Sequence, residues 1–203
     1  PEWKPDFGPA KFNPAAGATA IGARNFLIAY NINLNTKNVK LAKDIAFEIR
    51  ETGKLKRDEK GNKVVGPDGV ALREPGIFKN LQGTGWIIPE YGRAQITVNI
   101  LDIETTPVHL VYDKCCELAE KLGCRVTGSE VVGMIPRKVL RDAGIYFLKK
   151  QGSTTGVSDD EIIHNGIISL GLSDVAAFDP KQKIIEERFM NEKPLVSMTL
   201  EAF

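Results

Sequence analysis

Two histidines and three cysteines are the side chains of this sequence with the widest range of catalytic and metal-binding chemistry. His109 is expected near the start of one helix and His164 in the middle of another, and neither has a partner at the spacing of a zinc site. Cys115 and Cys116 are adjacent and Cys124 stands apart, so they form neither a C-x-x-C pair nor an even disulfide set. We therefore interpret the histidines as structural or exposed and the cysteines as small apolar groups, and we predict no catalytic residue and no metal site in this chain.

Signatures of several enzyme classes are absent. The sequence contains no GxxxxGKS, GxxxxGKT, GxSxG, HExxH or GxGxxG motif, which argues against the usual nucleotide-binding, serine-hydrolase and zinc-protease sites. With 27 basic and 26 acidic residues the formal charge is +1, so no overall field attracts nucleic acid or an anionic membrane. Apolar runs fall far short of the roughly 20 residues that span a bilayer. We expect a cytoplasmic protein without nucleic-acid or membrane partners.

The segment at residues 5–19, PDFGPAKFNPAAGAT, has an unusual composition. It combines three prolines, two glycines and two phenylalanines, which excludes a helix. Proline fixes the backbone and glycine allows it to approach a ligand closely, so a rigid loop could offer N–H groups and aromatic edges to a flat heterocycle. Composition alone favours the alternative, an ordinary N-terminal arm, over a ligand-binding loop.

The strands and helices expected after this segment would position such a loop. Alternating apolar residues predict strands at residues 26–34 and 94–101, and shorter strands are expected at 85–89 and 125–132. Helical spacing predicts one helix that is capped by Asn35 or Thr36 and ends at Gly53, and another from Pro107 to Gly123. This order is the βαββαβ of an α+β, ferredoxin-like fold, with an antiparallel sheet and both helices on one face. Further helices are expected at 136–150 and 159–170, and a short edge element at Ile184–Ile185.

Residues 53–80 interrupt this order as a basic insertion. Seven basic residues face four acidic ones from residue 54 to residue 80, and the sequence Gly66-Pro67-Asp68-Gly69 predicts a turn. A protruding hairpin is one interpretation and a mobile excursion another. The domains expected are a lead-in at residues 1–24, a ferredoxin-like domain at 25–189 that includes the insertion, and a linker or tail at 190–203.

Five motifs occur in the order found in the glutamate formimidoyltransferase family. They are Pro5-Asp6-Phe7-Gly8-Pro9, the stretch from Gly17 to Gly22-Ala23-Arg24, the run from Phe26 to Leu34, Gln82-Gly83-x-Gly85-Trp86, and Val131-Val132-Gly133-x-x-Pro136. The similarity runs from about residue 3 to residue 189. The chain therefore resembles the carboxyl-side subdomain of that family.

The resemblance implies a one-carbon transferase that moves the formimino group of N-formimino-L-glutamate to tetrahydrofolate in histidine degradation. Tetrahydrofolate is the co-substrate and no metal is involved. Two ferredoxin-like subdomains enclose the folate in that family, and one loop of the carboxyl-side subdomain is a folate-binding segment. The residues of this chain that match that loop are Gly8, Pro9, Ala10, Lys11, Phe12, Asn13, Pro14, Ala15, Ala16 and Gly17.

The resemblance also places the family's catalytic histidine in an amino-terminal subdomain ahead of Pro1. That subdomain is the expected partner, so this chain alone is predicted to lack transferase turnover, and a homo-oligomer stays open. The competing hypothesis is a noncatalytic ferredoxin-like module for ligand binding or oligomerisation.

Overall fold

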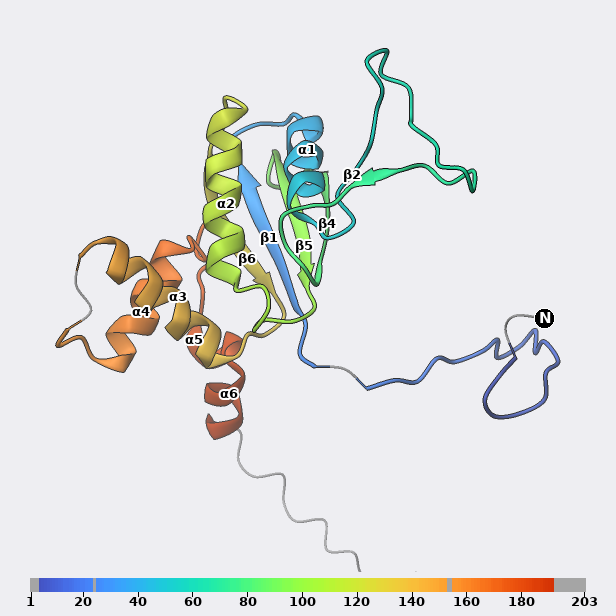
Figure 1. Ribbon diagram of the computed structural model, residues 1–203. Coiled ribbons are helices and arrows are strands. Elements are labelled where there is room, and N and C mark those ends of the chain that lie inside the picture. Colours follow the sequence, from blue (N-terminus) through green and yellow to red (C-terminus); the bar gives the residue numbers. More distant parts are fainter. Residues whose placement is uncertain (1–3, 24, 153–154, 192–203) are drawn as a thin grey trace, which may run out of the picture.

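The computed structural model describes residues 4–23, 25–152 and 155–191. Its centre is a four-stranded sheet in the order β4-β5-β1-β6, and every neighbouring pair is antiparallel. The strands are β1 (Ile28–Leu34), β4 (Leu81–Ile88), β5 (Arg93–Ile100) and β6 (Val126–Val132), and the helices between them are α1 (Val39–Ile49) and α2 (Val108–Lys121). The ferredoxin-like βαββαβ prediction is confirmed (Figure 1).

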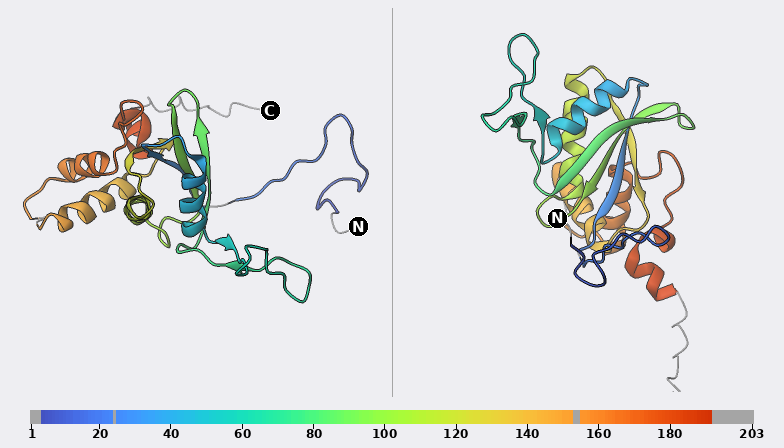
Figure 2. Two further views of the ribbon diagram at one scale, coloured as in Figure 1. Left: turned by 90° about the horizontal axis from the view of Figure 1, so that it is seen from above. Right: turned by 90° about the vertical axis from the view of Figure 1, so that its right-hand side faces the viewer.

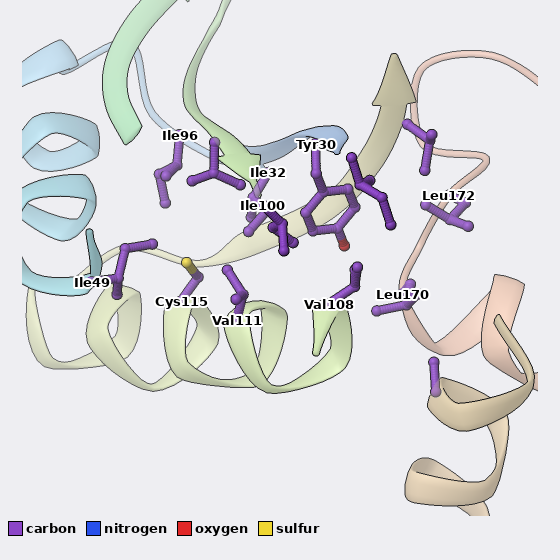
Figure 3. Close-up of a cluster of buried hydrophobic side chains, with 14 of the residues drawn as sticks. Tyr30, Ile32, Ile49, Ile96, Ile100, Val108, Val111, Cys115, Leu170 and Leu172 are labelled. Carbon is purple, nitrogen blue, oxygen red and sulfur yellow. The ribbon is translucent and has the colours of Figure 1, made fainter. Parts of the chain in front are cut away.

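One face of the sheet is covered by α1 and α2 and holds the core (Figures 1 and 3). Successive side chains of a strand point to opposite faces, and on β1 the buried Ile28, Tyr30, Ile32 and Leu34 belong to the core. The Tyr30 hydroxyl donates to Ser129 Oγ at 2.8 Å, and Ser129 Oγ donates to the Leu170 carbonyl at 2.5 Å. Burial raises the pKa of Tyr30 well above its usual value, so this phenol remains a donor.

The opposite face carries no helix of the described part of the chain. The right-hand view of Figure 2 shows the strands from this side, and the left-hand view shows the helices on the other. We call this surface the open face, and define it by the side chains of β1, β4, β5 and β6 that alternate with the core residues. It is the sheet surface that remains available to a ligand or a second domain.

Residues 53–76 form the protruding hairpin that was one of the two expectations for the insertion. Its base is a two-stranded sheet of β2 (Lys54–Leu55) and β3 (Arg73–Glu74). The predicted turn is present, because the Gly66 N–H donates to the Val70 carbonyl at 2.8 Å. The hairpin extends away from the sheet in Figure 1.

Four helices follow β6: α3 (Arg137–Lys150), α4 (Asp159–Ser169), α5 (Pro180–Lys183) and α6 (Ile185–Asn191). The first two confirm the predicted pair, and Ser158 caps α4 by accepting from the Glu161 N–H at 3.2 Å. The two helices approach closely at glycines, since a Cβ at Gly144 would lie 1.9 Å from the Ile162 carbonyl oxygen. Ile184 makes a single parallel bridge to Ile135 in place of the expected edge element.

Two boundaries differ from the prediction. The N-cap of α1 is Asn38, whose side chain accepts from the Lys40 N–H, whereas Thr36, two residues earlier, accepts from the Asn38 N–H through its Oγ1. Strand β4 begins at Leu81 and pairs with β5 along its whole length, so it is longer than the predicted strand at 85–89. The predicted tail beyond residue 191 lies outside the described residues. Within the described part of the chain, no helix combines the length and the hydrophobicity needed to cross a membrane.

Candidate functional site on the open face

Four polar side chains occupy the centre of the open face. Asn31 and Asn33 come from β1, Gln95 from β5 and Glu130 from β6. Asn33 and Gln95 are fully buried and Asn31 is 4% exposed, although no helix of the described residues packs over them. Buried polar groups are costly unless they are hydrogen-bonded, so their geometry decides whether this face is a stable part of the fold.

These side chains satisfy one another in a network that crosses three strands. Gln95 Nε2 donates to Asn33 Oδ1 at 2.6 Å and to Glu130 Oε1 at 3.0 Å. Asn31 Nδ2 donates to the same Glu130 oxygen at 2.9 Å. The indole Nε1 of Trp86, on the edge strand β4, donates to Gln95 Oε1 at 3.0 Å. The network therefore holds a carboxylate and an aromatic ring in fixed positions on either side of Gln95.

A second group of polar side chains surrounds Asp174, in the segment after α4. Asp174 Oδ2 accepts from Asn33 Nδ2 at 2.9 Å, from Thr127 Oγ1 at 2.9 Å and from Arg93 at 2.8 Å. Burial alone would raise the pKa of Asp174, but the hydrogen bonds from Asn33 and Thr127 and the ion pair with Arg93 outweigh it. The net effect is a pKa below the usual value of a carboxyl group. This aspartate ties the segment after α4 to the sheet.

A local irregularity of β6 brings Thr127 into this group. Asn33 pairs with Gly128 and Leu34 pairs with Val126, so Thr127 is the extra residue on the β6 side of a register shift. A bulge of this kind redirects side chains near the end of a strand pair. Thr127 thereby contacts Asp174 while Glu130, further along β6, keeps its place on the open face.

The open face suits recognition of a planar polar group. Trp86 is 47% exposed and offers a ring surface, while the half-buried Glu130, held by the neighbouring amides, offers a hydrogen-bond acceptor at a fixed position. The face carries no histidine among the described residues. It can therefore bind and orient a ligand, but it lacks the side chain best suited to proton transfer near neutral pH.

The ten predicted substrate-binding residues lie elsewhere, on an exposed arm at residues 4–23 that extends away from the sheet (Figures 1 and 2). Within it, Asn13 Oδ1 accepts from the N–H groups of Ala15 and Ala16 at 3.0 and 3.1 Å, and the Gly17 N–H donates to the Asn13 carbonyl at 2.8 Å. The loop borders an open hollow of about 630 Å³, whose lining consists of arm residues. The structure brings the ten residues together but not next to the open face.

His109 and His164 occupy positions that fit a structural or exposed role. His109 lies on α2 and stacks on Tyr146 of α3 with ring centroids 4.6 Å apart, on the side of the sheet away from the open face. Burial lowers the pKa of His109, and its Nδ1 has no hydrogen-bond partner among the described residues. His164 is exposed on α4. Neither imidazole lies near the polar network of the open face.

The cysteines are free thiols, and Cys115 and Cys124 are buried. Burial raises the pKa of Cys116 to about 11, which leaves it a weak nucleophile near neutral pH. Among the described residues, no group of three or more His, Cys, Asp or Glu side chains is arranged to hold a metal ion.

The comparisons with known proteins all point to the same family. A family model described as the formiminotransferase domain matches residues 29–190. The chain is 41% identical over 206 residues to a formimidoyltransferase-cyclodeaminase of Gallus gallus, with all of this chain and 35% of the relative covered. It is 32% identical over 155 residues to a glutamate formimidoyltransferase of Thermoplasma acidophilum, with 76% of this chain and 44% of the relative covered.

A glutamate formimidoyltransferase of Streptococcus pyogenes serotype M1 gives a similar match, with 32% identity over 148 residues and 42% of the relative covered. The chain thus spans between about a third and somewhat less than half of the length of these relatives. The matched region includes all four strands of the central sheet apart from the first residue of β1, together with α1 to α6 as far as residue 190. On this evidence the chain belongs to the formiminotransferase-domain family.

Proposed function

We propose that this chain is the folate-binding, carboxyl-side half of a glutamate formimidoyltransferase, which transfers the formimino group of N-formimino-L-glutamate to tetrahydrofolate in histidine degradation. The observation that carries the proposal is the similarity along the chain to proteins named for this activity, two of which are glutamate formimidoyltransferases. In this proposal an amino-terminal subdomain is the partner and supplies the catalytic histidine.

The open face supports this assignment. A ferredoxin-like sheet with one face packed on helices has its other face free to form a cleft with a second domain. Here that face carries a hydrogen-bonded polar network and an exposed indole in place of an apolar surface. A folate has a flat heterocycle with several N–H groups, which matches an aromatic ring beside fixed acceptors. The arm with residues 8–17 would then form another wall of the cleft.

The reaction defines what this half has to contribute. An amine nitrogen of the folate attacks the formimino carbon, a new C–N bond forms, and the C–N bond to glutamate breaks. The attacking amine gives up a proton and the leaving amine takes one, which is work for an imidazole near neutral pH. Without such a group on the open face, this chain holds the two substrates in register and shapes the cleft.

Formimino transfer, measured with N-formimino-L-glutamate and tetrahydrofolate, tests the proposal directly. The assay compares this chain alone with the same chain joined to the segment encoded upstream of Pro1. We expect the isolated chain to fold, with a cooperative melt, and to show no turnover, and we expect the joined protein to be active. Absence of transfer by the joined protein, or turnover by the isolated chain, would contradict the proposal.

The same preparation distinguishes the noncatalytic alternative. An oligomerisation module would associate through its open face and bind no folate, whereas the proposed half-enzyme requires folate binding by the joined protein. Sedimentation of the isolated chain, together with titration of a reduced folate into the joined protein, separates these two outcomes.

A further inference from the structure

Glu130 is a carboxylate of the open face whose hydrogen bonding is incomplete among the described residues. Its Oε1 accepts from Asn31 Nδ2 at 2.9 Å and from Gln95 Nε2 at 3.0 Å. Its Oε2 has no hydrogen-bond partner and no ion pair in the part of the chain that the structure describes. An ionised carboxyl group can accept about four hydrogen bonds, so half of its capacity is unused on a half-buried side chain.

The two donors hold this carboxylate in a fixed orientation. Asn31 is 4% exposed and Gln95 is fully buried, so neither amide can turn to solvent. Gln95 is itself fixed, because it donates to Asn33 and accepts from the Trp86 indole. Oε1 of Glu130 is therefore hydrogen-bonded within the protein, and Oε2 is available to a ligand. The bonds to Oε1 fix the orientation of Oε2 before any ligand binds.

The second carboxylate nearby is in a different situation. Asp174 forms an ion pair with Arg93 and accepts from Thr127 and Asn33, so its charge is already balanced. Glu130 receives only neutral amide donors. A partly buried carboxylate without a cation is most favourably completed by a ligand that brings N–H groups, with or without positive charge.

We propose that Glu130 accepts the N–H groups of a planar N–C–N fork of the substrate, with the exposed ring of Trp86 beside it as a stacking surface. The proposal rests on the proposed function. Two groups in that reaction have this chemistry: the amidine of the formimino substrate, and the 2-aminopyrimidine edge of the folate heterocycle. Both present N–H donors in one plane, and the free Oε2 has two lone pairs that can accept them.

The decisive variant is Glu130→Gln in the joined, active protein. The new side chain is nearly isosteric, and its carbonyl oxygen can still accept from Asn31 and Gln95, so the inner network is retained. Its amide nitrogen then replaces Oε2, so a hydrogen-bond donor faces the N–H donors of the ligand and the contact is lost. The matched control is Glu120→Gln, which removes the same charge from an exposed position of α2. Thermal melts establish that both variants are folded.

Binding is measured separately for N-formimino-L-glutamate and for a reduced folate, together with the KM for each. We expect Glu130→Gln to weaken one of the two by about tenfold to a hundredfold and to leave the other within about twofold, while the control changes neither. The affected substrate identifies the source of the fork. If Glu130→Gln proves unfolded, Glu130→Asp is the second variant. It keeps the charge on a side chain that is one methylene shorter, and it should weaken binding of only one of the two substrates.

Two results would overturn the inference. Unchanged affinity for both substrates in a folded variant rules out the contact, even if turnover falls. An equal loss of affinity for both substrates also rules out the contact, because that result indicates a general disturbance of the open face. Either result leaves the proposed function intact if the unmutated joined protein transfers the formimino group. Failure of the unmutated protein to do so contradicts the proposed function itself.

Discussion

Gly17 has a backbone φ of +64°, a conformation that side chains with a Cβ rarely adopt. A Cβ at this position would meet nothing within 4 Å, so a larger residue would collide with no neighbouring atom. A branched side chain would strain the turn that follows Asn13 and block close approach of the backbone to a ligand. Gly17 is therefore a sensitive probe of whether the arm binds folate.

We expect Gly17→Val to weaken binding of a reduced folate to the joined protein by about tenfold to a hundredfold, while the melting temperature is unchanged. Gly22→Val is the control, because Gly22 is also unobstructed but does not have a positive φ. Isothermal titration of both variants decides the matter. Normal affinity in a folded Gly17→Val protein would rule out the arm as a wall of the cleft.

Asp174 makes a pH-dependent contribution to stability. Because its pKa is lowered in the folded state, this contribution is fully present above the unfolded pKa of about 4 and is lost as the pH falls through the folded value. We expect Asp174→Asn to lower the free energy of unfolding by about 1–3 kcal/mol at neutral pH. The difference from the unmutated chain should shrink below about pH 4.

Urea unfolding at several pH values checks this, with Asp6→Asn on the exposed arm as the control for loss of one charge. A stability difference that stayed constant between pH 7 and pH 3 would mean that Asp174 acts by packing and not by its charge.

The polar network of the open face was not predicted, although its residues were visible. Asn31 and Asn33 alternate with core residues of β1, and Gln95 alternates with those of β5, a pattern that equally fits a solvated sheet face. What distinguishes the two cases is register, because Asn33 lies opposite Gln95 and Asn31 lies opposite Glu130. Pairing across strands depends on the tertiary fold, which periodicity within one strand does not contain.

At the scale of elements, strong alternation predicted the central strands β1 and β5. The predicted strand at 85–89 missed the first four residues of the edge strand β4. The pattern of β1 is regular because every second residue is a large core side chain. In β4, Gly83 and Gly85 take the place of such side chains, and only Leu81 and Gly85 are buried. A Cβ at Gly85 would lie 2.4 Å from the Lys43 backbone nitrogen, so close packing against α1 requires glycine at this position. Without large apolar side chains, the first half of β4 lacks the alternating pattern by which a strand is predicted.

The hairpin at residues 53–76 carries its positive charge unevenly. Lys54, at its base, pairs with Glu48 at 3.0 Å and with Glu74 at 3.6 Å. Towards the tip, Lys56, Lys60 and Lys63 are exposed. Because no ion pair engages them among the described residues, these three lysines are more available than Lys54 to attract an anionic tail such as the glutamate chain of a polyglutamylated folate.

We expect neutralisation of all three lysines to glutamine to reduce the preference of the joined protein for polyglutamate over monoglutamate folate by about threefold to tenfold at low salt. The effect should be smaller at physiological salt, where such charges are screened. Replacing Lys40, Lys149 and Lys181, which are exposed but lie outside the hairpin, is the matched control. An unaltered ratio of the two affinities at low salt would contradict the idea.

At the scale of the whole molecule, the described chain has one packed side and one side that is open. The helices α1 and α2 bury the apolar face of the sheet, and α3 packs on α4 and lies beside α2 (Figure 1). Local patterns predicted this layered order, because each helix shows its own apolar stripe. The course of residues 4–23 was not predictable in the same way, since no core residue of the described chain comes from the arm.

The separation of the arm from the domain has a consequence for limited proteolysis. The peptide bond after Lys4 is followed by proline and resists trypsin, whereas the bond between Lys11 and Phe12 is exposed in a segment whose backbone hydrogen bonds are local. We expect trypsin to cut there early and to leave the remaining domain folded. If the arm closes over a bound folate in the joined protein, saturating folate should slow this cut, as followed by intact-mass spectrometry. A cleavage rate independent of folate would place the arm outside the cleft, so this bond reports on closure without any mutation.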